Sequence, residues 1–147
     1  MIFINKYFNE LTTNELYEVL KARAAIFVVE QNCVYQDLDG VDERSLHIFY
    51  MSDGKVNAYM RAFEKDSEPD TVQAGRVLTM EHGKGMGGRL LREGIQCIRD
   101  KMHPKRIYIE AQCYATRYYE REGFRICSEE FLEDGIPHVA MILEFEK

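Results

Sequence analysis

The sequence predicts an α/β (α+β) protein in which helices cover both faces of a mixed sheet. Segments with the period of strands alternate with segments with the period of helices along most of the chain. Two pairs, Asp53-Gly54 and Asp134-Gly135, separate apolar segments as hairpin turns do. A cluster of four glycines lies between an expected strand and an amphipathic helix. Because 147 residues suffice for one hydrophobic core, we expect a single domain, 1–147.

The first half of the chain is predicted to form a strand, a helix and a hairpin. Thr12 and Glu15 have the spacing of a capping box, which places the start of the helix. Apolar residues at helical spacing then continue to about Gln31. The expected elements are a strand at 2–5, a helix from about 13 to Gln31, a turn at 37–43 and strands at 46–51 and 56–64.

The second half is predicted to add a helix between two strands, then a shorter helix and a final hairpin. Four apolar residues define one stripe of the first of these helices: Leu91, Ile95, Ile98 and Met102. The expected elements are strands at 72–79 and 105–110, a helix at 112–121, and strands at 124–131 and 138–145. The resulting order is βαβββαβαββ.

Charge and cysteine usage exclude several classes of protein. The chain has 19 basic and 25 acidic residues, a formal charge of −6, which does not favour nucleic acid as a partner. The four cysteines have neither CxxC pairing nor metal-like spacing, so we expect reduced thiols and no metal site. The first residues lack the features of a signal peptide, and no apolar run reaches membrane-spanning length. We therefore expect a cytoplasmic protein that does not bind a membrane.

The glycine cluster has three possible interpretations. Gly83, Gly85 and Gly88 fit the dinucleotide pattern G-x-G-x-x-G, and Glu110 ends the next strand, where a ribose-binding acid would lie. That interpretation conflicts with the single βαβ unit of the chain. The glycines could instead serve only a sharp turn, for which four are more than is needed. In the third interpretation they bind the phosphates of a different cofactor at a helix N-terminus.

The run "HGKGMGGRLL" resembles the acyl-CoA pyrophosphate loop of the GNAT superfamily of N-acetyltransferases, in which Gly85 and Gly87 hold the two glycine positions. The runs "IFVVEQNCVYQDLDGVD", "AGRV", "YYEREGF" and "EDGIPHVAM" are similar to the ElaA-like branch of that superfamily, in the same order. The chain departs from the family pattern at His82, where Arg or Gln is usual. The link from the strand to the loop, Met80-Glu81, is also shorter than usual.

The resemblance implies a mostly antiparallel sheet in which the central strand pair is splayed. In that gap, unpaired backbone groups would hold the pantetheine arm of acetyl-CoA, and an amide near Val77 or Leu78 would polarise the thioester carbonyl. Glycine removes the Cβ atoms that would keep phosphates away. The expected cofactor-binding residues are Val77, Leu78, Thr79, His82, Gly83, Lys84, Gly85, Met86, Gly87, Gly88 and Gln112.

Tyr119 is the expected proton donor to the departing thiolate, because the family has its helix tyrosine four residues before Gly123-Phe124. A phenol and a thiol have similar basicity, which permits that proton transfer. Tyr118 would point about 100° away on a helix and would be structural. A buried aromatic role for Tyr119 remains an alternative.

The proton acceptor is less defined, because the strand before the loop contains no acid. Glu30 follows four apolar residues, and partial burial would raise its pKa into a useful range. His138 follows the "DGIP" turn, and His47 lies in the strand 46–51. Each could also be structural, and ordered water could relay the proton. The acidic turn 37–43 lacks calcium-loop spacing, but its charge could attract an ammonium substrate.

The resemblance implies an N-acetyltransferase that moves an acetyl group from acetyl-CoA to a primary amine by direct attack in a ternary complex. The acceptor would be a small molecule or a peptide, and the chain could pair as a homodimer. Two other functions remain open: a regulatory module that binds CoA without turnover, and a reductase that uses a nicotinamide dinucleotide.

Overall fold

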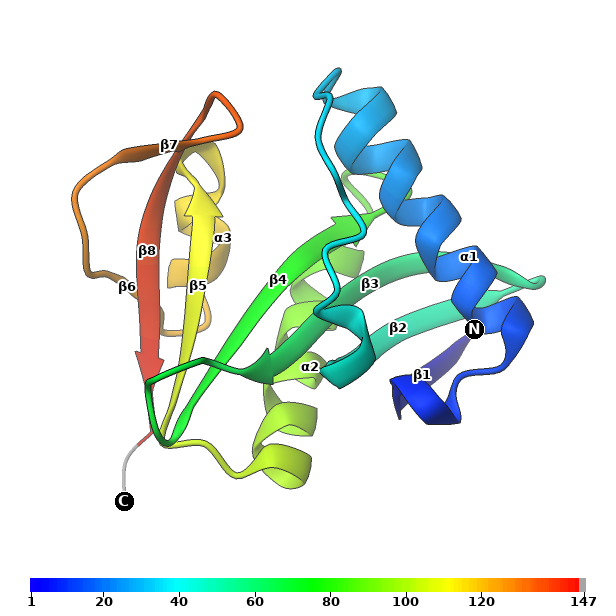
Figure 1. Ribbon diagram of the computed structural model, residues 1–147, viewed down its shortest axis with the longest axis horizontal. Helices are drawn as coiled ribbons and strands as arrows, with labels where there is room; N and C mark the ends of the chain where they lie inside the picture. Colours follow the sequence, from blue (N-terminus) through cyan, green and yellow to red (C-terminus); the bar gives the residue numbers. More distant parts are fainter. Residues whose placement is uncertain (146–147) are drawn as a thin grey trace.

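The computed structural model describes residues 1–145 as one eight-stranded sheet with helices on both faces (Figure 1). The strands are β1 (Ile2–Tyr7), β2 (Leu46–Ser52), β3 (Lys55–Glu64), β4 (Thr71–Thr79), β5 (Arg106–Gln112), β6 (Arg125–Ile126), β7 (Phe131–Glu133) and β8 (Ile136–Glu144). The longer helices are α1 (Thr13–Arg23), its π-helical continuation η2 (Ala24–Glu30), α2 (Met86–Met102) and α3 (Thr116–Glu120). Short 3-10 turns are η1 (Phe8–Glu10), η3 (Asp42–Arg44) and η4 (Cys113–Ala115).

The central strands β4 and β5 separate along their length. The sheet order is β1-β2-β3-β4-β5-β8-β6, and β7 pairs with β8; among these pairs, β4 with β5 is parallel and the others are antiparallel. The pairing of β4 with β5 covers only Thr71–Ala74 against Arg106–Ile109. Beyond this point the two strands diverge, as Figure 1 shows. The expected mixed, mostly antiparallel sheet with a splayed central pair is confirmed.

A bulge in β4 lies at the start of this gap. Tyr59 pairs with Leu78 and Arg61 pairs with Gly75, so two residues of β4 face one residue of β3. One of the two is Arg76, whose φ of 50° lies in the left-handed region. The bulge bends β4 away from β5 and changes the direction of its backbone groups.

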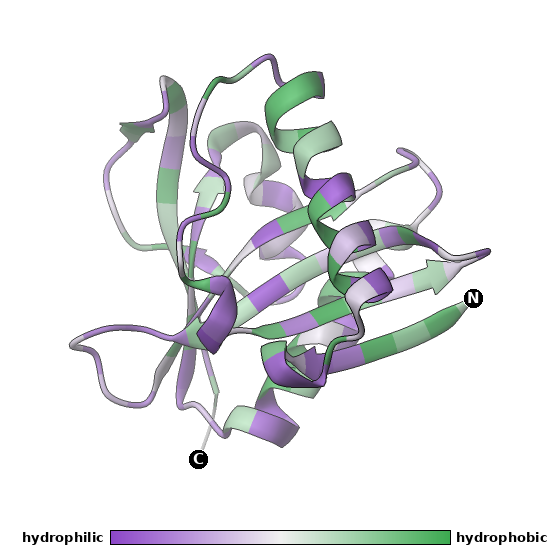
Figure 2. Ribbon diagram, turned by 45° about the vertical axis from the view of Figure 1, so that its right-hand side comes forward, coloured by the Kyte–Doolittle hydropathy of each residue, from purple (hydrophilic) through white to green (hydrophobic). Residues whose placement is uncertain are grey.

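Successive residues of β2 point to opposite faces of the sheet and pack against different helices. Ile48 and Tyr50 lie in a core with Leu90 and Ile98 of α2. Phe49 instead packs with residues of α1, including Val19 and Ala22. In Figure 2 hydrophobic and hydrophilic colours alternate along the strands. The prediction of helices on both faces is therefore confirmed.

Two predicted elements have different boundaries in the structure. The expected helix 112–121 begins later, because Gln112 still pairs with His138 in the sheet and a 3-10 turn follows it. The expected strand 124–131 is divided into β6 and β7. At the interruption, the Ser128 hydroxyl accepts a hydrogen bond from the Ala140 amide at 2.8 Å, in place of a backbone carbonyl. A side-chain hydroxyl thus takes the place of a backbone carbonyl in the strand pairing, and no periodicity in the sequence predicts this.

The two predictions for the first helix agree with the structure. The Thr12 hydroxyl accepts from the Glu15 amide at 3.1 Å, and the Glu15 carboxylate accepts from the Thr12 amide at 2.8 Å. The helix ends at Glu30, close to the expected Gln31, but its last seven residues are π-helical.

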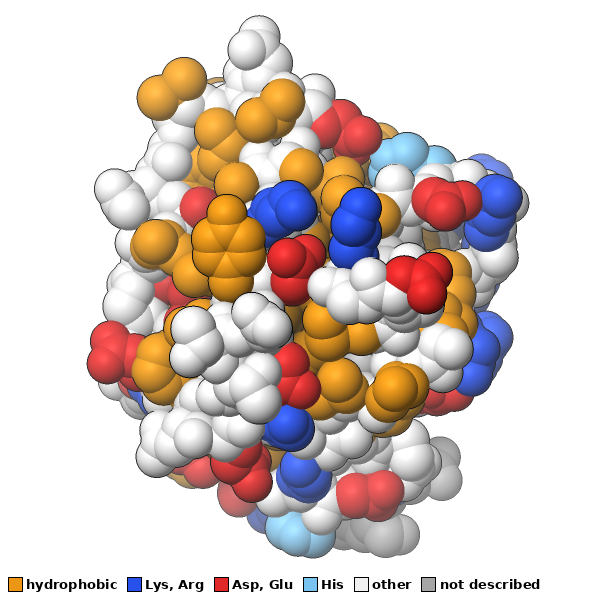
Figure 3. Space-filling view, turned by 90° about the vertical axis from the view of Figure 1, so that its right-hand side faces the viewer, with side chains coloured by type: hydrophobic (Ala, Val, Ile, Leu, Met, Phe, Trp, Pro, Cys, Tyr) orange, Lys and Arg blue, Asp and Glu red, His pale blue; other side chains and the backbone are white. Residues whose placement is uncertain are grey.

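On the face in Figure 3, basic side chains are interspersed with acidic and hydrophobic ones. None of the helices within residues 1–145 combines the length and the apolar character needed to span a bilayer.

Candidate active site

A cavity of about 710 Å³ opens where β4 and β5 separate. Its walls come from the second half of β4, the end of β5, the loop before α2, and the β7–β8 hairpin. Residues from distant parts of the sequence therefore meet around one space. All the expected cofactor-binding residues except Gly88 line this cavity, and so do Tyr119, Glu30 and His138.

The glycine loop ends at the N-terminus of α2. Gly83 and Gly85 have φ values of 78° and 75°, which favour glycine, and Gly85 is the N-cap residue. The first intrahelical bond runs from the Arg89 amide to the Gly85 carbonyl. The amides of residues 85–88 at the start of α2 precede this bond and have no acceptor within the helix. Unpaired amides and the positive end of the helix dipole together make this loop suitable for a phosphate group.

Space around the loop differs between its glycines. A Cβ atom at Gly85 would meet no atom within 4 Å, so this position is open. A Cβ atom at Gly87 would instead lie 3.2 Å from the Tyr118 ring. The Tyr118 hydroxyl donates a hydrogen bond of 2.5 Å to the Gly87 carbonyl. The small size of Gly87 therefore accommodates a tyrosine, which the motif did not predict.

His82 lies at the outer rim of the loop rather than inside it. Its Nε2 atom lies 3.3 Å from the carboxylate of Glu30, at the end of η2. The side chains of His82 and Glu30 are 65% and 51% exposed. The partial burial expected for Glu30 is therefore not found, because half of its side chain is exposed. The next basic residue, Lys84, is also exposed and lies 3.2 Å from Glu81.

The adjacent residues of β4 point to different sides of the sheet. Val77 packs against the core beneath α2, whereas Leu78 packs against the core beneath α1. Thr79 and Leu78 pair with Ala58 and Tyr59 of β3, while their other backbone edge faces the gap. This edge provides unpaired strand groups along the cavity wall.

Tyr119 is 8% exposed and packs edge-on against Tyr118 and Phe124, with ring centroids 4.8 Å and 5.8 Å away. Burial raises the pKa of Tyr119 and that of Tyr118. Both phenols therefore stay protonated at neutral pH, but each is a weaker acid than free tyrosine, so its basicity matches that of a thiolate less closely. The two side chains differ in their contacts, since Tyr118 holds the Gly87 carbonyl.

Gln112, at the end of β5, links two sides of the cavity. Its side-chain oxygen accepts a hydrogen bond from Gln31 at 3.2 Å, at the end of the first helix. Nearby, the Cys33 thiol donates a 3.8 Å hydrogen bond to the Asp134 carbonyl of the β7–β8 turn. These contacts hold the segment after η2 against the hairpin.

His138 lies on β8, directly opposite Gln112 in the sheet. Its Nδ1 atom donates to the Ile136 carbonyl at 2.7 Å, and its ring stacks on Phe131. Its Nε2 atom lies 3.4 Å from the carboxylate of Glu133. Burial raises the pKa of Glu133, and the nearby carboxylate of Glu110 raises it further. A buried imidazole and two carboxylates thus form one group at the cavity wall.

The acidic turn 37–43 is neutralised by arginines. Arg23 binds Asp37 and Asp42, Arg61 binds Asp39 and Asp42, and Arg76 binds Asp37 and Asp39, at N–O distances of 2.6 to 3.3 Å. Three positive charges therefore balance three negative ones. The Asp39 carboxylate is partly desolvated, but its bonds with Arg61 lower its pKa overall. The expectation that this turn attracts an ammonium substrate is not supported, because its charge is already paired.

His47 belongs to the same network and is fully buried. Its ring contacts the Tyr59 hydroxyl at 2.7 Å and the Asp42 carbonyl at 2.9 Å. Burial lowers its pKa. His47 is therefore a structural residue outside the cavity.

The sequence did not reveal three contributors to the site. Tyr118 was expected to be structural only, and Glu133 had no motif. Arg76 appeared within "AGRV", but its left-handed backbone and its pairing with Asp37 depend on the bulge. In each case the signal is a contact between residues far apart in the chain.

A parted β4–β5 pair beside a glycine-rich helix N-terminus is the arrangement that the resemblance to GNAT acetyltransferases implies. The profile of the acetyltransferase (GNAT) domain matches residues 11–145. The Escherichia coli protein ElaA is 36% identical over 140 residues, which is 92% of each chain. A UPF0039 protein of Schizosaccharomyces pombe is 36% identical over 146 residues, covering 97% of this chain and 96% of that protein.

Two crystal structures have the same fold. ElaA of Escherichia coli superposes with a TM-score of 0.91 over 98% of this chain and all of its own. An acyl-CoA N-acyltransferase of Pseudomonas aeruginosa, 34% identical, also has a TM-score of 0.91 and covers 97% of this chain and 99% of its own. This chain belongs to the GNAT acetyltransferase family and resembles its ElaA-like members.

Proposed function

We propose that the protein is an N-acetyltransferase that moves an acetyl group from acetyl-CoA to a primary amine by direct attack in a ternary complex. The main support is the position of the glycine loop at one end of the β4–β5 gap. A phosphate-binding helix terminus and an unpaired strand edge thus share one cavity. Bound acetyl-CoA would supply an acetyl group activated as a thioester.

The residues around the cavity suit this cofactor. The open space at Gly85 and the unpaired amides at the start of α2 would hold the diphosphate. His82, Lys84 and Met86 would line its outer side, and Gln112 would bound the far end of the gap. The unpaired edge at Val77, Leu78 and Thr79 would hold the pantetheine arm as an added strand does.

Proton transfer requires a donor and an acceptor at the cavity. Tyr119 would hold a proton for the leaving sulfur, because burial keeps its phenol protonated. His138 is a better proton acceptor than Glu30, since its buried ring presents Nε2 toward the cavity side of β8. Glu30 is half exposed and pairs with His82, so we assign it to the rim of the cofactor loop.

Two measurements test this function. CoA should raise the melting temperature of the protein, because it binds the folded state. Acetyl-CoA should then release free thiol when polyamines, amino acid amides, aminoglycosides or peptides are offered. Absence of CoA protection would contradict the proposed cofactor site.

A module that binds CoA without turnover is the second candidate. The pairing of His82 with Glu30 favours this second candidate. His82 stands where the family usually has Arg or Gln, and its side chain already contacts a carboxylate of this chain. CoA protection without thiol release for any amine would support this candidate over the enzyme.

A further inference from the structure

The wall of the cavity formed by β5, β7 and β8 contains two carboxylates beside a buried imidazole. Glu110 lies on β5, Glu133 ends β7, and His138 lies on β8. All three line the cavity. The Tyr108 hydroxyl donates to Glu110 at 2.9 Å, which holds that carboxylate in place. The other charged group close to Glu133 is Asp134, in the turn that follows.

Neighbouring carboxylates repel one another, and the repulsion is stronger when they are partly removed from water. The raised pKa of Glu133 reflects burial first, then the charge of Glu110 and a hydrogen bond between the two carboxyl groups. A cation placed between the two carboxylates would relieve this repulsion. The pair is therefore suited to bind a positively charged group.

The tautomer of His138 is set by its backbone partner. A carbonyl only accepts hydrogen bonds, so Nδ1 must hold the proton that it donates to Ile136. In the neutral ring, Nε2 then holds the lone pair and lies 3.4 Å from the carboxyl group of Glu133. His138 is only 6% exposed, so this lone pair lies in a buried position at the cavity wall.

The cations that line the cavity are already paired. Within residues 1–145 these basic side chains are Arg61, Arg76 and Lys84. Arg61 and Arg76 bind the carboxylates of the turn 37–43, and Lys84 lies 3.2 Å from Glu81. None is left to neutralise a carboxylate on the acceptor. Arg61 nevertheless has a buried Nε without a hydrogen-bond partner in the described chain, which could serve a neutral oxygen.

We propose that Glu110, Glu133 and His138 form the acceptor subsite. The two carboxylates bind the ammonium of a primary amine that has no carboxylate on the neighbouring carbon, and His138 takes the proton of that ammonium. This inference rests on the proposed acetyl transfer and names the substrate class that it uses. Amines, amino acid amides and peptide amines are included, and free α-amino acids are excluded.

The proton step is balanced within the subsite. One N–H bond of the ammonium breaks, and its electron pair remains on the nitrogen, which becomes a neutral nucleophile. A new N–H bond forms at Nε2 of His138. The positive charge moves to the ring, where the Glu133 carboxylate compensates it, and the proton leaves to solvent after the product departs.

The first test compares acceptors that differ in one carboxylate. Thiol release from acetyl-CoA is measured for phenylalaninamide against phenylalanine and for tyramine against tyrosine. We expect kcat/KM to be at least tenfold higher for the member of each pair without the carboxylate. Equal or higher values for phenylalanine and tyrosine would overturn the subsite while leaving acetyl transfer intact.

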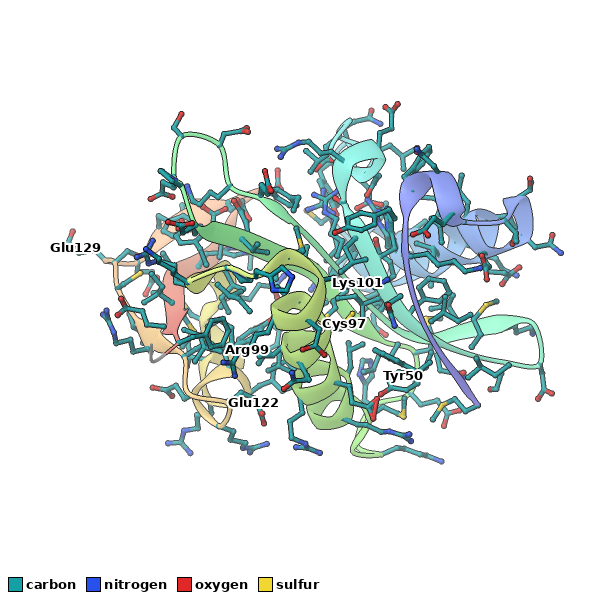
Figure 4. The ribbon with its side chains drawn as sticks, turned by 90° about the horizontal axis from the view of Figure 1, so that it is seen from below. Tyr50, Cys97, Arg99, Lys101, Glu122 and Glu129 are labelled. Atoms are coloured by element: carbon teal, nitrogen blue, oxygen red, sulfur yellow. The ribbon has the colours of Figure 1, made fainter. Side chains whose placement is uncertain are left out.

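The second test measures binding and does not need turnover. Tyramine, phenylalaninamide and putrescine are titrated into the full chain with CoA present, and the His138 ring proton is followed by NMR, assigned with His138→Gln. We expect Glu133→Gln and Glu110→Gln to weaken binding at least tenfold. Glu129→Gln is the matched control, since its exposed side chain points away from the sheet in Figure 4, and it should change binding less than twofold.

The two tests separate the two proposals. If the amines bind in a carboxylate-dependent way but no thiol is released, acetyl transfer is wrong and the cation site stands. If none of the amines perturbs His138, or if both glutamine variants bind like the wild type, the acceptor subsite is wrong.

Discussion

Tyr118 and Tyr119 both line the cavity but differ in their contacts, and Tyr119 is buried whereas Tyr118 is partly buried. Tyr119 packs within aromatic side chains, whereas Tyr118 fixes the backbone of the cofactor loop. Replacing each by phenylalanine removes one hydroxyl without changing the volume of the side chain much. Comparing the two variants therefore distinguishes the proposed proton donation by Tyr119 from support of the loop by Tyr118.

We expect Tyr119→Phe to lower kcat by about 100-fold, the usual contribution of a general acid. CoA affinity, measured as the shift in melting temperature, should change little. Tyr118→Phe should instead weaken CoA binding by about 2- to 10-fold, the value of one lost hydrogen bond. Wild-type turnover in Tyr119→Phe across the pH range would remove this residue from the mechanism.

The glycine loop should not tolerate branched side chains. Gly85→Val would force a β-branched residue into a left-handed conformation, at φ 75°, and would place methyl groups in open cofactor space. Gly87→Val would displace Tyr118. We expect both variants to fold and to lose CoA protection in a thermal melt.

Gly54→Val is the control for the loop variants. Gly54 also has a positive φ, 72°, but lies in the β2–β3 hairpin. The Gly54→Val variant should have a lower melting temperature than the wild type, but CoA should raise that temperature by the same amount in both proteins. Normal CoA binding by Gly85→Val would contradict the assignment of the loop.

Helix α2 lies close to the sheet, and glycine permits this approach. Figure 4 shows α2 in front of the sheet, with Cys97 near Tyr50 of β2. Both lie in the core, as does Met60. A Cβ atom at Gly94 would overlap the Met60 sulfur, which is 1% exposed and has little room to move.

We expect Gly94→Ala to destabilise the protein by about 1–3 kcal/mol, as overpacking of a core does. Alanine favours the helix by up to about 1 kcal/mol, which offsets part of this cost. Gly88→Ala on the same helix is the control, because its Cβ would meet only the long side chain of Arg92. Urea denaturation should show Gly94→Ala less stable than the wild type, and Gly88→Ala unchanged or more stable by up to about 1 kcal/mol; equal stabilities of the two variants would show that α2 can shift.

Strand β4 supports the site through its bulge. Arg76 adopts a left-handed backbone that only a specific partner would stabilise, and Asp37 provides one at 2.8 Å. Asp37 also binds Arg23 at the end of α1. The acidic turn therefore connects the first helix to the strand edge that borders the cavity.

The ion network makes stability depend on pH at the level of the entire fold. Asp39 and Asp42 have pKa values lowered by their arginine partners, against the effect of burial. Their contribution is complete above the unfolded pKa, near 4, and is lost as pH falls toward the lower folded values. Glu133 acts in the opposite direction, because its raised pKa favours folding on protonation.

We therefore expect the free energy of unfolding to fall steeply below about pH 4. Asp39→Asn should reduce this slope, since its group no longer titrates. Urea titrations at several pH values provide the measurement. If the free energy of unfolding of Asp39→Asn falls with decreasing pH as steeply as that of the wild type, Asp39 does not contribute to acid unfolding. Glu129→Gln, an exposed position, is the comparison.

Local patterns in the chain were sufficient for most of the fold. Thr12 with Glu15, the Asp53-Gly54 turn and the apolar stripe of α2 depend on neighbours within a few residues, and all three were predicted. The boundaries at Gln112 and Ser128 were missed. Both depend on pairing with β8, more than ten residues away.

The glycine-rich turn and the helix after it were predicted from spacing, because backbone freedom and helix geometry act over short distances. The expected role of the turn in binding acyl-CoA, and that of Tyr119, came from the resemblance to the family. The partners of Tyr118, Arg76 and His138 were not readable, since each contact joins segments brought together by the sheet. Short-range patterns thus placed the glycine-rich turn at the start of α2. Only the tertiary structure determines which charged side chains are paired with an opposite charge and which face the cavity. The reason is that electrostatic interactions depend on the distance between groups in space and not on their separation along the chain.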